Sequence, residues 1–245
     1  MQLAHSSWQE VEAYLATHHG IIVPIGSTEQ HGPNGLIGTD AICPEVVARR
    51  VGEELETLVA PTVAFGNAQH HLAFTGTMTL RPSTLLAVVR DLVQSLAHHG
   101  FRKVYFLNGH GGNVATVTAA FSEVYAGVSL DNARAVQCRL RNWYEGPRVK
   151  ALSGELFGDA EGSHGTASEV AITQYAHPGS IKPVTFQGKA PASSGIFDCQ
   201  DYRRRYPDGR IGSDPSLASP AHGERLVTAA VMDVLEDYRQ FLDNA

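Results

Sequence analysis

Short apolar runs alternate along this chain with longer segments in which apolar residues recur every three or four positions. The apolar runs predict buried strands at residues 20–23, 58–63, 103–107 and 133–140. The recurring pattern predicts amphipathic helices at about residues 7–15, 43–58, 82–99, 113–125, 169–175 and 223–242. Because strands alternate with helices, we expect an α/β fold with a largely parallel sheet flanked by helices on both faces.

Local signals mark the ends of several helices. Ser7 and Glu10 have the spacing of a capping box at the start of the first helix. Pro44 is expected in the first turn of the second helix, where its missing N–H removes no hydrogen bond. Gly100 is expected to close the helix that begins at Pro82.

Two segments, 143–165 and 178–218, show little periodicity and are expected to be irregular. The second is rich in proline, glycine and serine and is too long for a plain connector, and such segments commonly form lids or subunit contacts. Its apolar residues are expected to pack against a neighbouring subunit: Ile181, Val184, Phe186, Ile196 and Phe197.

The bulk composition is that of an ordinary compact globular protein. The 245 residues are expected to form one domain, 1–245, with 43% hydrophobic and 18% charged residues. A formal net charge of −6 argues against nucleic-acid binding, for which basic faces are typical. No apolar stretch approaches the roughly 20 residues that span a bilayer, and the amino terminus lacks a secretory signal. We therefore expect a cytoplasmic protein without a membrane partner, whose three scattered cysteines are reduced.

Residues with metal-ligand chemistry follow the first predicted strand. Glu29 and His31 stand just beyond it, and Asp40 follows further along the same loop. Ligands collect at strand ends in open α/β sheets, and these side chains supply oxygen and nitrogen ligands for a zinc-like or manganese-like ion. The alternative is a polar surface loop in which Gly32 and Pro33 simply turn the chain.

Two further clusters have the same character. His110 lies in the sequence NGHGGN directly after the strand at 103–107, flanked by glycines that allow tight turns and close backbone approach. His164 and Glu169 straddle the predicted start of a later helix. A carboxylate in that first helical turn either completes a coordination sphere or simply favours the helix dipole.

These motifs together resemble the creatininase (creatinine amidohydrolase) family. The resemblance covers nearly the whole chain through GSTEQHGPNGLIGTD (26–40), GNAQHHLAFTGTMTL (66–80), NGHGGN (108–113), HGTASE (164–169) and DPSLASPAHGERL (214–226). It implies a three-layer, Rossmann-like α/β fold and a two-metal hydrolase that is usually assembled as a hexamer.

The resemblance also implies roles for particular residues. Two divalent ions (zinc first, with manganese or iron as alternatives) would be held by a mixed set of carboxylates and imidazoles, in which Asp40 is the bridge: Glu29, His31, Asp40, His110 and Glu169. His164 matches a histidine to which a catalytic or substrate-binding role is attached.

One position departs from the pattern of creatinine-hydrolysing members of the family. Their second motif looks like NGHYEN, with a glutamate ligand, whereas this chain has Gly112 at that position. Their tryptophan-bearing loop also lacks a counterpart here, because Trp143 lies too far upstream of His164. The glycine form is similar to members that are formamide hydrolases or peptidases of peptide-cofactor maturation, so creatinine is not the expected substrate.

The expected function is therefore hydrolysis of a non-peptide C–N bond, in a small cyclic amide or formamide, by a bridging metal-bound hydroxide. His164 is expected to deliver the proton that the leaving nitrogen needs, with Glu161 as a weaker candidate. His70 and His71 are candidates for substrate contact. The alternatives are creatinine amidohydrolase proper, a peptidase, a nucleotide-binding module without the usual glycine and lysine motif, and a metal-stabilised scaffold without activity.

Overall fold

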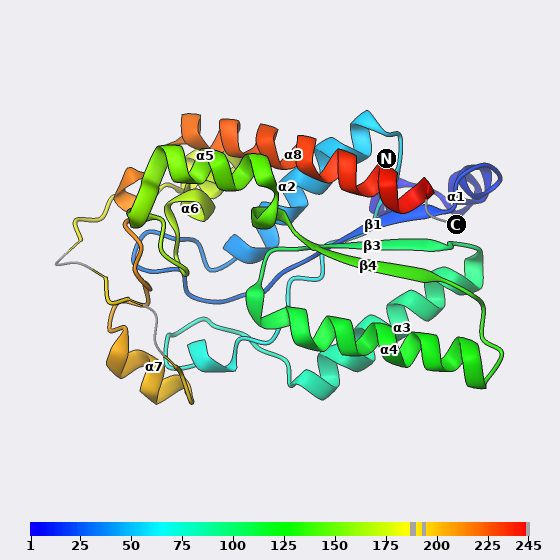
Figure 1. Ribbon diagram of the computed structural model, residues 1–245, viewed down its shortest axis with the longest axis horizontal. Coiled ribbons are helices and arrows are strands. Elements are labelled where there is room, and N and C mark those ends of the chain that lie inside the picture. The colour runs from blue at the N-terminus through cyan, green and yellow to red at the C-terminus, as the bar shows by residue number, and fades with distance from the viewer. Residues whose placement is uncertain (187–189, 193–194, 244–245) are drawn as a thin grey trace.

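A four-stranded parallel sheet forms the centre of the computed structural model, which describes residues 1–186, 190–192 and 195–243 (Figure 1). The strands lie in the order β2-β1-β3-β4, with β1 at Gly20–Ile25, β2 at Leu58–Val59, β3 at Lys103–Asn108 and β4 at Gln137–Asn142. β1 and β3 pair along their whole length, from Gly20 opposite Lys103 to Ile25 opposite Asn108.

Helices cover both faces of this sheet, because alternate side chains of a strand point to opposite faces. In β1, Ile22 belongs to one apolar core, and Ile21 and Val23 belong to the other. Four helices complete the first core: α2 (Thr39–Glu54), α5 (Pro147–Phe157), α6 (Ala167–Ala176) and α8 (Pro220–Asp243). Three complete the second: α1 (Trp8–Leu15), α3 (Pro82–His99) and α4 (Val114–Leu130). The three-layer α/β prediction is confirmed, and none of the described helices is long and apolar enough to cross a membrane (Figure 1).

The predicted helix ends are confirmed at α1 and α3. Ser7 Oγ accepts a hydrogen bond from the Glu10 N–H, and the Glu10 carboxylate accepts one from the Ser7 N–H at 2.6 Å. Pro82 lies in the first turn of α3. Gly100 ends that helix with a φ of 113°, a left-handed conformation that glycine adopts without strain.

The start of α2 differs from the prediction. The helix begins earlier, at Thr39, so Pro44 lies inside it rather than in its first turn. Pro44 has no N–H to donate to the Asp40 carbonyl one turn before it. That carbonyl instead lies against Gly26 and Gly109, where an added Cβ would sit 2.1 and 2.0 Å from the oxygen. Glycine therefore lets the loops after β1 and β3 close onto the first turn of α2.

The segments expected to be irregular each contain a helix. Residues 143–165 include α5, whose apolar periodicity is weak because one of its sides faces a cavity rather than the core. Residues 178–218 include the short helix α7 (Cys199–Arg205), which Asp198 caps by accepting from the N–H groups of Gln200 and Asp201.

Two strands are shorter than predicted. β4 begins at Gln137 rather than at residue 133, because Ala133 donates its N–H to Gly127 near the end of α4. β2 ends at Val59, and Pro61, which has no N–H, interrupts the ladder beyond it.

The strand order places a crevice between β1 and β3. The chain leaves β1 for β2 on one side and later enters β3 on the other side, so the order reverses at this point. In open α/β sheets, ligands bind at the carboxyl ends of the strands where such a reversal occurs. The loops after β1 and β3 run toward the end of the molecule that carries α6 and α7 (Figure 1).

Candidate metal centre

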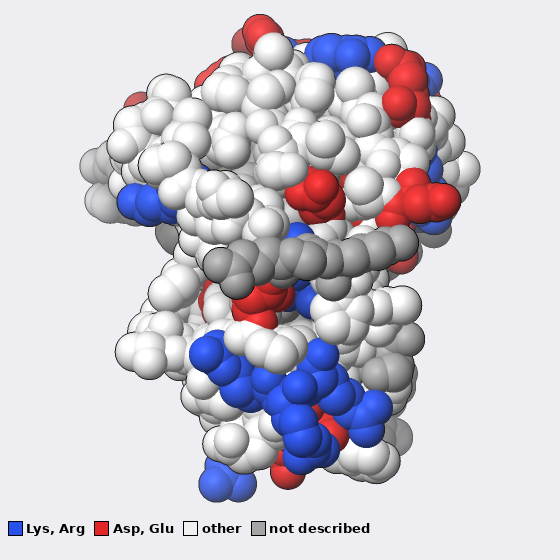
Figure 2. Space-filling view, turned by 90° about the vertical axis from the view of Figure 1, so that its left-hand side faces the viewer, with Lys and Arg blue, Asp and Glu red and all other residues white. Residues whose placement is uncertain are grey.

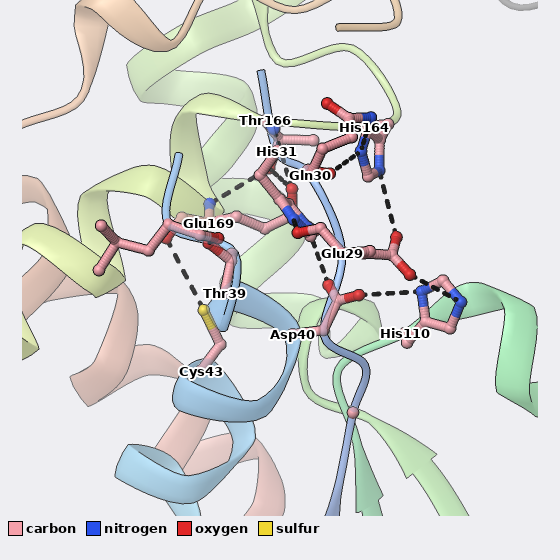
Figure 3. A network of polar contacts seen from close by, with 12 residues as sticks. Glu29, Gln30, His31, Thr39, Asp40, Cys43, His110, His164, Thr166 and Glu169 are labelled. Atoms are coloured by element: carbon pink, nitrogen blue, oxygen red, sulfur yellow. Dashed lines mark hydrogen bonds and ion pairs between the residues drawn. The ribbon is translucent and has the colours of Figure 1, made fainter. Parts of the chain in front are cut away.

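Side chains from four segments meet at the carboxyl ends of β1 and β3 (Figure 3). The loop after β1 supplies Glu29 and His31, and the first turn of α2 supplies Asp40. The loop after β3 supplies His110, and the first turn of α6 supplies Glu169. The structure thus brings together all five residues that the sequence analysis named as metal ligands. Glu29 and His31 are completely buried, and Asp40 and His110 are nearly so.

Asp40 lies at the centre of this cluster. Its Oδ1 is 3.0 Å from His31 Nε2, and its Oδ2 is 2.9 Å from His110 Nδ1. It belongs to two sets of possible ligand atoms, one with Glu29 and His110 and the other with His31 and Glu169. Within each set the atoms lie within 4.8 Å of one another. A carboxylate shared by two sets in this way is placed to bridge two ions.

The buried oxygens of the cluster have unsatisfied hydrogen-bonding capacity. Among the described residues, neither carboxylate oxygen of Glu29 nor Oδ2 of Asp40 has a hydrogen-bond partner. Histidine nitrogens lie 2.9–3.3 Å from these oxygens, but not in hydrogen-bonding geometry. Buried carboxylate oxygens are unfavourable without a cation or a donor. Because carboxylate and imidazole donors suit divalent zinc, manganese and iron, the cluster fits such ions.

Burial and neighbouring charges shift the pKa values of the ionisable groups in the cluster. Burial disfavours an ionised Asp40, yet the charges of His31 and His110 overcome it and hold the pKa of this carboxyl far below its ordinary range. Burial likewise opposes charge on His31 and His110, but the nearby carboxylates raise their pKa values to about 10 and about 9. Burial also raises the pKa of Glu29. Metal binding would therefore displace protons from the two imidazoles.

Glu169 both caps the start of α6 and faces the cluster as a possible metal ligand. Its Oε2 accepts hydrogen bonds from the Thr166 N–H and hydroxyl, both at 2.9 Å, as in a capping box. One carboxylate oxygen also belongs to the set that contains His31 and Asp40. The helix cap therefore fixes the direction in which this carboxylate faces the cluster.

Asn108, at the end of β3, holds the backbone of His110. Its Nδ2 donates to the His110 carbonyl at 2.7 Å, and its Oδ1 accepts from the His110 N–H at 3.2 Å. The Nε2 atom of His110 lies 3.0 Å from the carbonyl oxygen of Asn67. These contacts orient His110 in the manner of an outer-shell partner.

His164 faces the cluster from the loop before α6. Its Nδ1 lies 3.9 Å from Glu29 Oε1, and it forms a further set of possible ligand atoms with Glu29 and His31. Its Nε2 lies 2.8 Å from the backbone carbonyl of Gln30. The same nitrogen lies 2.9 Å from the Gln30 amide nitrogen. Because a carbonyl only accepts hydrogen bonds, the shorter contact favours the tautomer in which Nε2 carries the proton and Nδ1 presents a lone pair to the cluster.

The pKa of His164 in this structure is not the near-neutral value of a free imidazole. Burial lowers the pKa of His164 well below its usual value, and the imidazoles of His31 and His71 lower it further. The ring is therefore neutral, and it is suited to accept a proton before it donates one. Burial of this extent depends on α7 and the loops around it, which no local sequence pattern reports.

His71 is part of the cluster, although the sequence analysis named it only as a candidate for substrate contact. Its Nε2 lies 3.1 Å from Glu29 Oε1, and its Nδ1 lies 2.9 Å from Gln30 Nε2. Burial lowers the pKa of His71 to about 2, so the ring is neutral. With Gln30 donating to Nδ1, the proton of His71 lies on Nε2 and faces Glu29. In the sequence, the adjacent histidines His70 and His71 in a polar loop were the signal that could have identified this residue as part of the site.

A cavity of about 580 Å³ opens over the cluster. It reaches Asp40, His110, His164 and Glu169, and its other walls include residues that the sequence analysis did not single out as site residues: Tyr144, Lys150, Ser153, Gly154 and Tyr202. Figure 2 shows this side of the molecule hollowed, with acidic side chains inside the hollow and a dense group of basic side chains below it. The last turn of α7 carries three arginines.

Glu161, the weaker candidate for the proton transfer, also lines this cavity. Its carboxylate accepts hydrogen bonds from the Ser168 hydroxyl at 2.5 Å and the Ser168 N–H at 3.2 Å, so it holds the first turn of α6. Burial raises the pKa of Glu161 to about 7, and the charge of Glu169 contributes to this rise.

Glu161→Gln is expected to stabilise the metal-free protein increasingly as pH rises. The folded state binds the Glu161 proton more tightly than the unfolded state, so protonated Glu161 stabilises the wild-type fold. This stabilisation is fully present below pH 4.5 and is lost as pH rises through about 7. Glutamine does not titrate. Urea unfolding at pH 4.5 and 7.5 should show the free-energy difference shifting toward the variant by up to about 3 kcal/mol. Glu155→Gln, on the exposed side of α5, is the matched control, and a difference independent of pH would contradict the raised pKa.

Comparisons with known proteins agree with this geometry. A family model described as "Creatininase: Creatinine amidohydrolase" matches residues 4–237. The chain is 27% identical over 248 residues to creatinine amidohydrolase of Pseudomonas putida, which covers 96% of this chain and 94% of that protein. It is 27% identical over 234 residues to the mycofactocin precursor peptide peptidase of Mycobacterium ulcerans (strain Agy99), with 89% and 84% covered.

A solved structure of a mutant creatininase of Zn–Zn type has the same fold. It matches with a TM-score of 0.85 and 23% identity over 99% of this chain and 98% of that chain.

Proposed function

Because this chain belongs to the creatininase family, we propose that it is a metal-dependent amidohydrolase that cleaves a non-peptide C–N bond in a cyclic amide or formamide. One observation carries the proposal: Asp40 is shared by two sets of ligand atoms, Glu29 with His110 and His31 with the partly buried Glu169. These five side chains would hold two divalent ions. Zinc is our first choice, supported by the Zn–Zn form of a structural relative, and manganese and iron also suit the donors.

When bound, such ions lower the pKa of a water toward neutrality and polarise the carbonyl of an amide. The chain supplies the proton transfers. His164 Nδ1 accepts a proton from the attacking water, and it then donates this proton to the nitrogen that leaves as the C–N bond breaks. Throughout, its Nε2–H remains hydrogen-bonded to the Gln30 carbonyl, which keeps the ring in one tautomer and orientation.

Creatinine is not the substrate that this site favours. An added Cβ at Gly112 would lie 2.4 Å from His110 Nε2 and 2.6 Å from the Asn67 carbonyl. The local backbone therefore has no room for the glutamate that the resemblance leads one to expect in creatinine-hydrolysing enzymes.

We accordingly expect the metal-loaded protein to hydrolyse creatinine slowly, at about 0.1 per second or less, against about 10 per second for a typical enzyme. Gly112→Glu should displace His110 and lower the metal content rather than create creatinine turnover. Gly111→Ala, whose Cβ would lie 3.6 Å from the Tyr144 hydroxyl, is the matched control that should keep its metal. Creatinine turnover of about 10 per second or more by the unmodified protein would contradict this account of the substrate.

A peptidase is the second candidate, because the cavity also has room for a peptide end. A cavity of about 580 Å³ lies within the range of about 300–1,000 Å³ that drug-sized ligands occupy, so a peptide end fits as well as a small ring. A panel of formamides, cyclic amides and short peptides, assayed with zinc-loaded and chelated protein, separates the candidates. Bound metal with no turnover of any member would indicate a scaffold rather than an enzyme.

We further propose that residues 1–245 form one metallohydrolase domain that assembles as a homohexamer. The segment 178–218, which is expected to meet a neighbouring subunit, exposes apolar side chains. Phe197 is 88% exposed and Ile181 is 41% exposed. Exposed apolar groups of this kind favour a subunit contact. Light scattering of the metal-loaded protein tests this assembly, and a fully active monomer would contradict it.

A further inference from the structure

One wall of the cavity above the metal cluster is formed by α5. Lys150, Ser153 and Gly154 line the cavity from this helix, at a spacing that places them on one side of it. Val149, one turn before Ser153, belongs to the core. α5 therefore packs against the core along one side, and the cavity lies along the side next to it.

Gly154 has no packing reason to be glycine. An added Cβ at this position would meet no atom within 4 Å, in contrast to Gly112, where it would clash. Glycine inside a helix also destabilises that helix relative to alanine. The missing side chain therefore leaves volume open along α5, in the cavity that Asp40 also lines.

Lys150 provides a positive charge on this wall. Of the described residues that line the cavity, Lys150 is the only lysine or arginine. Its side chain is exposed, and within the described part of the chain no carboxylate forms an ion pair with it. The other cation near the start of α5, Arg148, is bound instead by Asp233 and Glu236. The ammonium of Lys150 is thus available to an anionic group of a ligand.

We propose that this wall is a specificity subsite, in which Lys150 binds a carboxylate on the amide substrate while the body of the substrate lies over Ser153 and Gly154. The inference rests on the proposed amidohydrolase function and names its substrate class, an amide that carries an acidic substituent. The cavity has room for both ends of such a molecule, because about 580 Å³ corresponds to about twenty waters.

Binding of two matched hydroxamates to zinc-loaded protein tests the subsite. Hydroxamates chelate divalent metals, so 4-carboxybenzohydroxamate and its neutral 4-carbamoyl analogue differ only at the end that would face α5. Calorimetry should show the acidic probe bound about tenfold more tightly, which is about 1.4 kcal/mol. Lys150→Met should abolish this preference, whereas Lys150→Arg should retain it, and high salt should weaken it.

Variants of Gly154 test the open wall independently of charge. Gly154→Ala should fold with an unchanged or higher melting temperature and bind both probes. Gly154→Leu should fill the volume and weaken binding of both aromatic probes by about tenfold or more, while acetohydroxamate, which carries a methyl group in place of the aromatic ring, binds as before.

Three outcomes would overturn the subsite. They are equal affinity of the unmodified protein for the two aromatic probes, a preference that survives Lys150→Met, and full affinity for both aromatic probes in Gly154→Leu. In each of these, acetohydroxamate still binds, so the metal centre stands and the subsite alone fails. If no hydroxamate binds at all, the metal centre and the subsite fail together.

Discussion

Asp40→Asn is expected to lose most of its bound metal and to lower kcat/KM by at least about 10³-fold. Asparagine keeps the size of the side chain but replaces one carboxylate oxygen by a nitrogen donor. In the wild type, the two oxygens lie 3.0 Å from His31 and 2.9 Å from His110, one toward each set of ligand atoms. The substitution therefore weakens both proposed ion sites at once. Elemental analysis and kinetics on the best substrate of the panel measure the two effects.

Two further variants sharpen this result. Glu169→Gln alters a residue that belongs to one set only, so it should lose about one ion and keep the other. Asp91→Asn, an exposed residue on α3, is the matched control and should keep both metal and activity. Full metal content in Asp40→Asn would show that Asp40 does not bridge.

His164→Ala is expected to keep most of its metal while losing about 10²–10⁴-fold in turnover, the usual effect of removing a general acid or base. Its Nδ1 lies 3.9 Å from Glu29 and presents a lone pair to the open side of the cluster. The ring is held by the Gln30 carbonyl rather than by the carboxylates, so its loss leaves both Asp40 sets intact.

His99→Ala, at the exposed end of α3, is the matched control for this substitution. A second reading of the structure places His164 among the ligands, because its ring also forms a set with Glu29 and His31. Loss of metal from His164→Ala, in parallel with loss of turnover, would favour that reading and contradict the proton-transfer role.

The sequence predicted the sheet and the main ligand cluster because these depend on local signals. The apolar runs at 20–23 and 103–107 are long enough to indicate buried strands, and each is followed at once by polar residues. Parallel strands end at the same edge of a sheet, so Glu29 and His110 were expected to meet there. α3 was predicted in full, since Pro82 and Gly100 mark its two ends.

The remaining features depend on contacts between distant segments. α2 begins early because Gly26 and Gly109 admit the Asp40 carbonyl, a packing arrangement that no periodicity reports. α5 was missed because its cavity side lacks apolar residues. The lowered pKa of His164 arises from burial and from the rings of His31 and His71, which only the folded chain brings near it.

The most direct test of the central claim is anomalous diffraction from crystals of the zinc-loaded protein, with data collected on both sides of the zinc absorption edge. We expect two zinc peaks per chain, one beside each set of ligand atoms that contains Asp40, both within about 2.0–2.2 Å of an Asp40 oxygen. A single peak, or peaks that do not touch Asp40, would contradict the dinuclear centre.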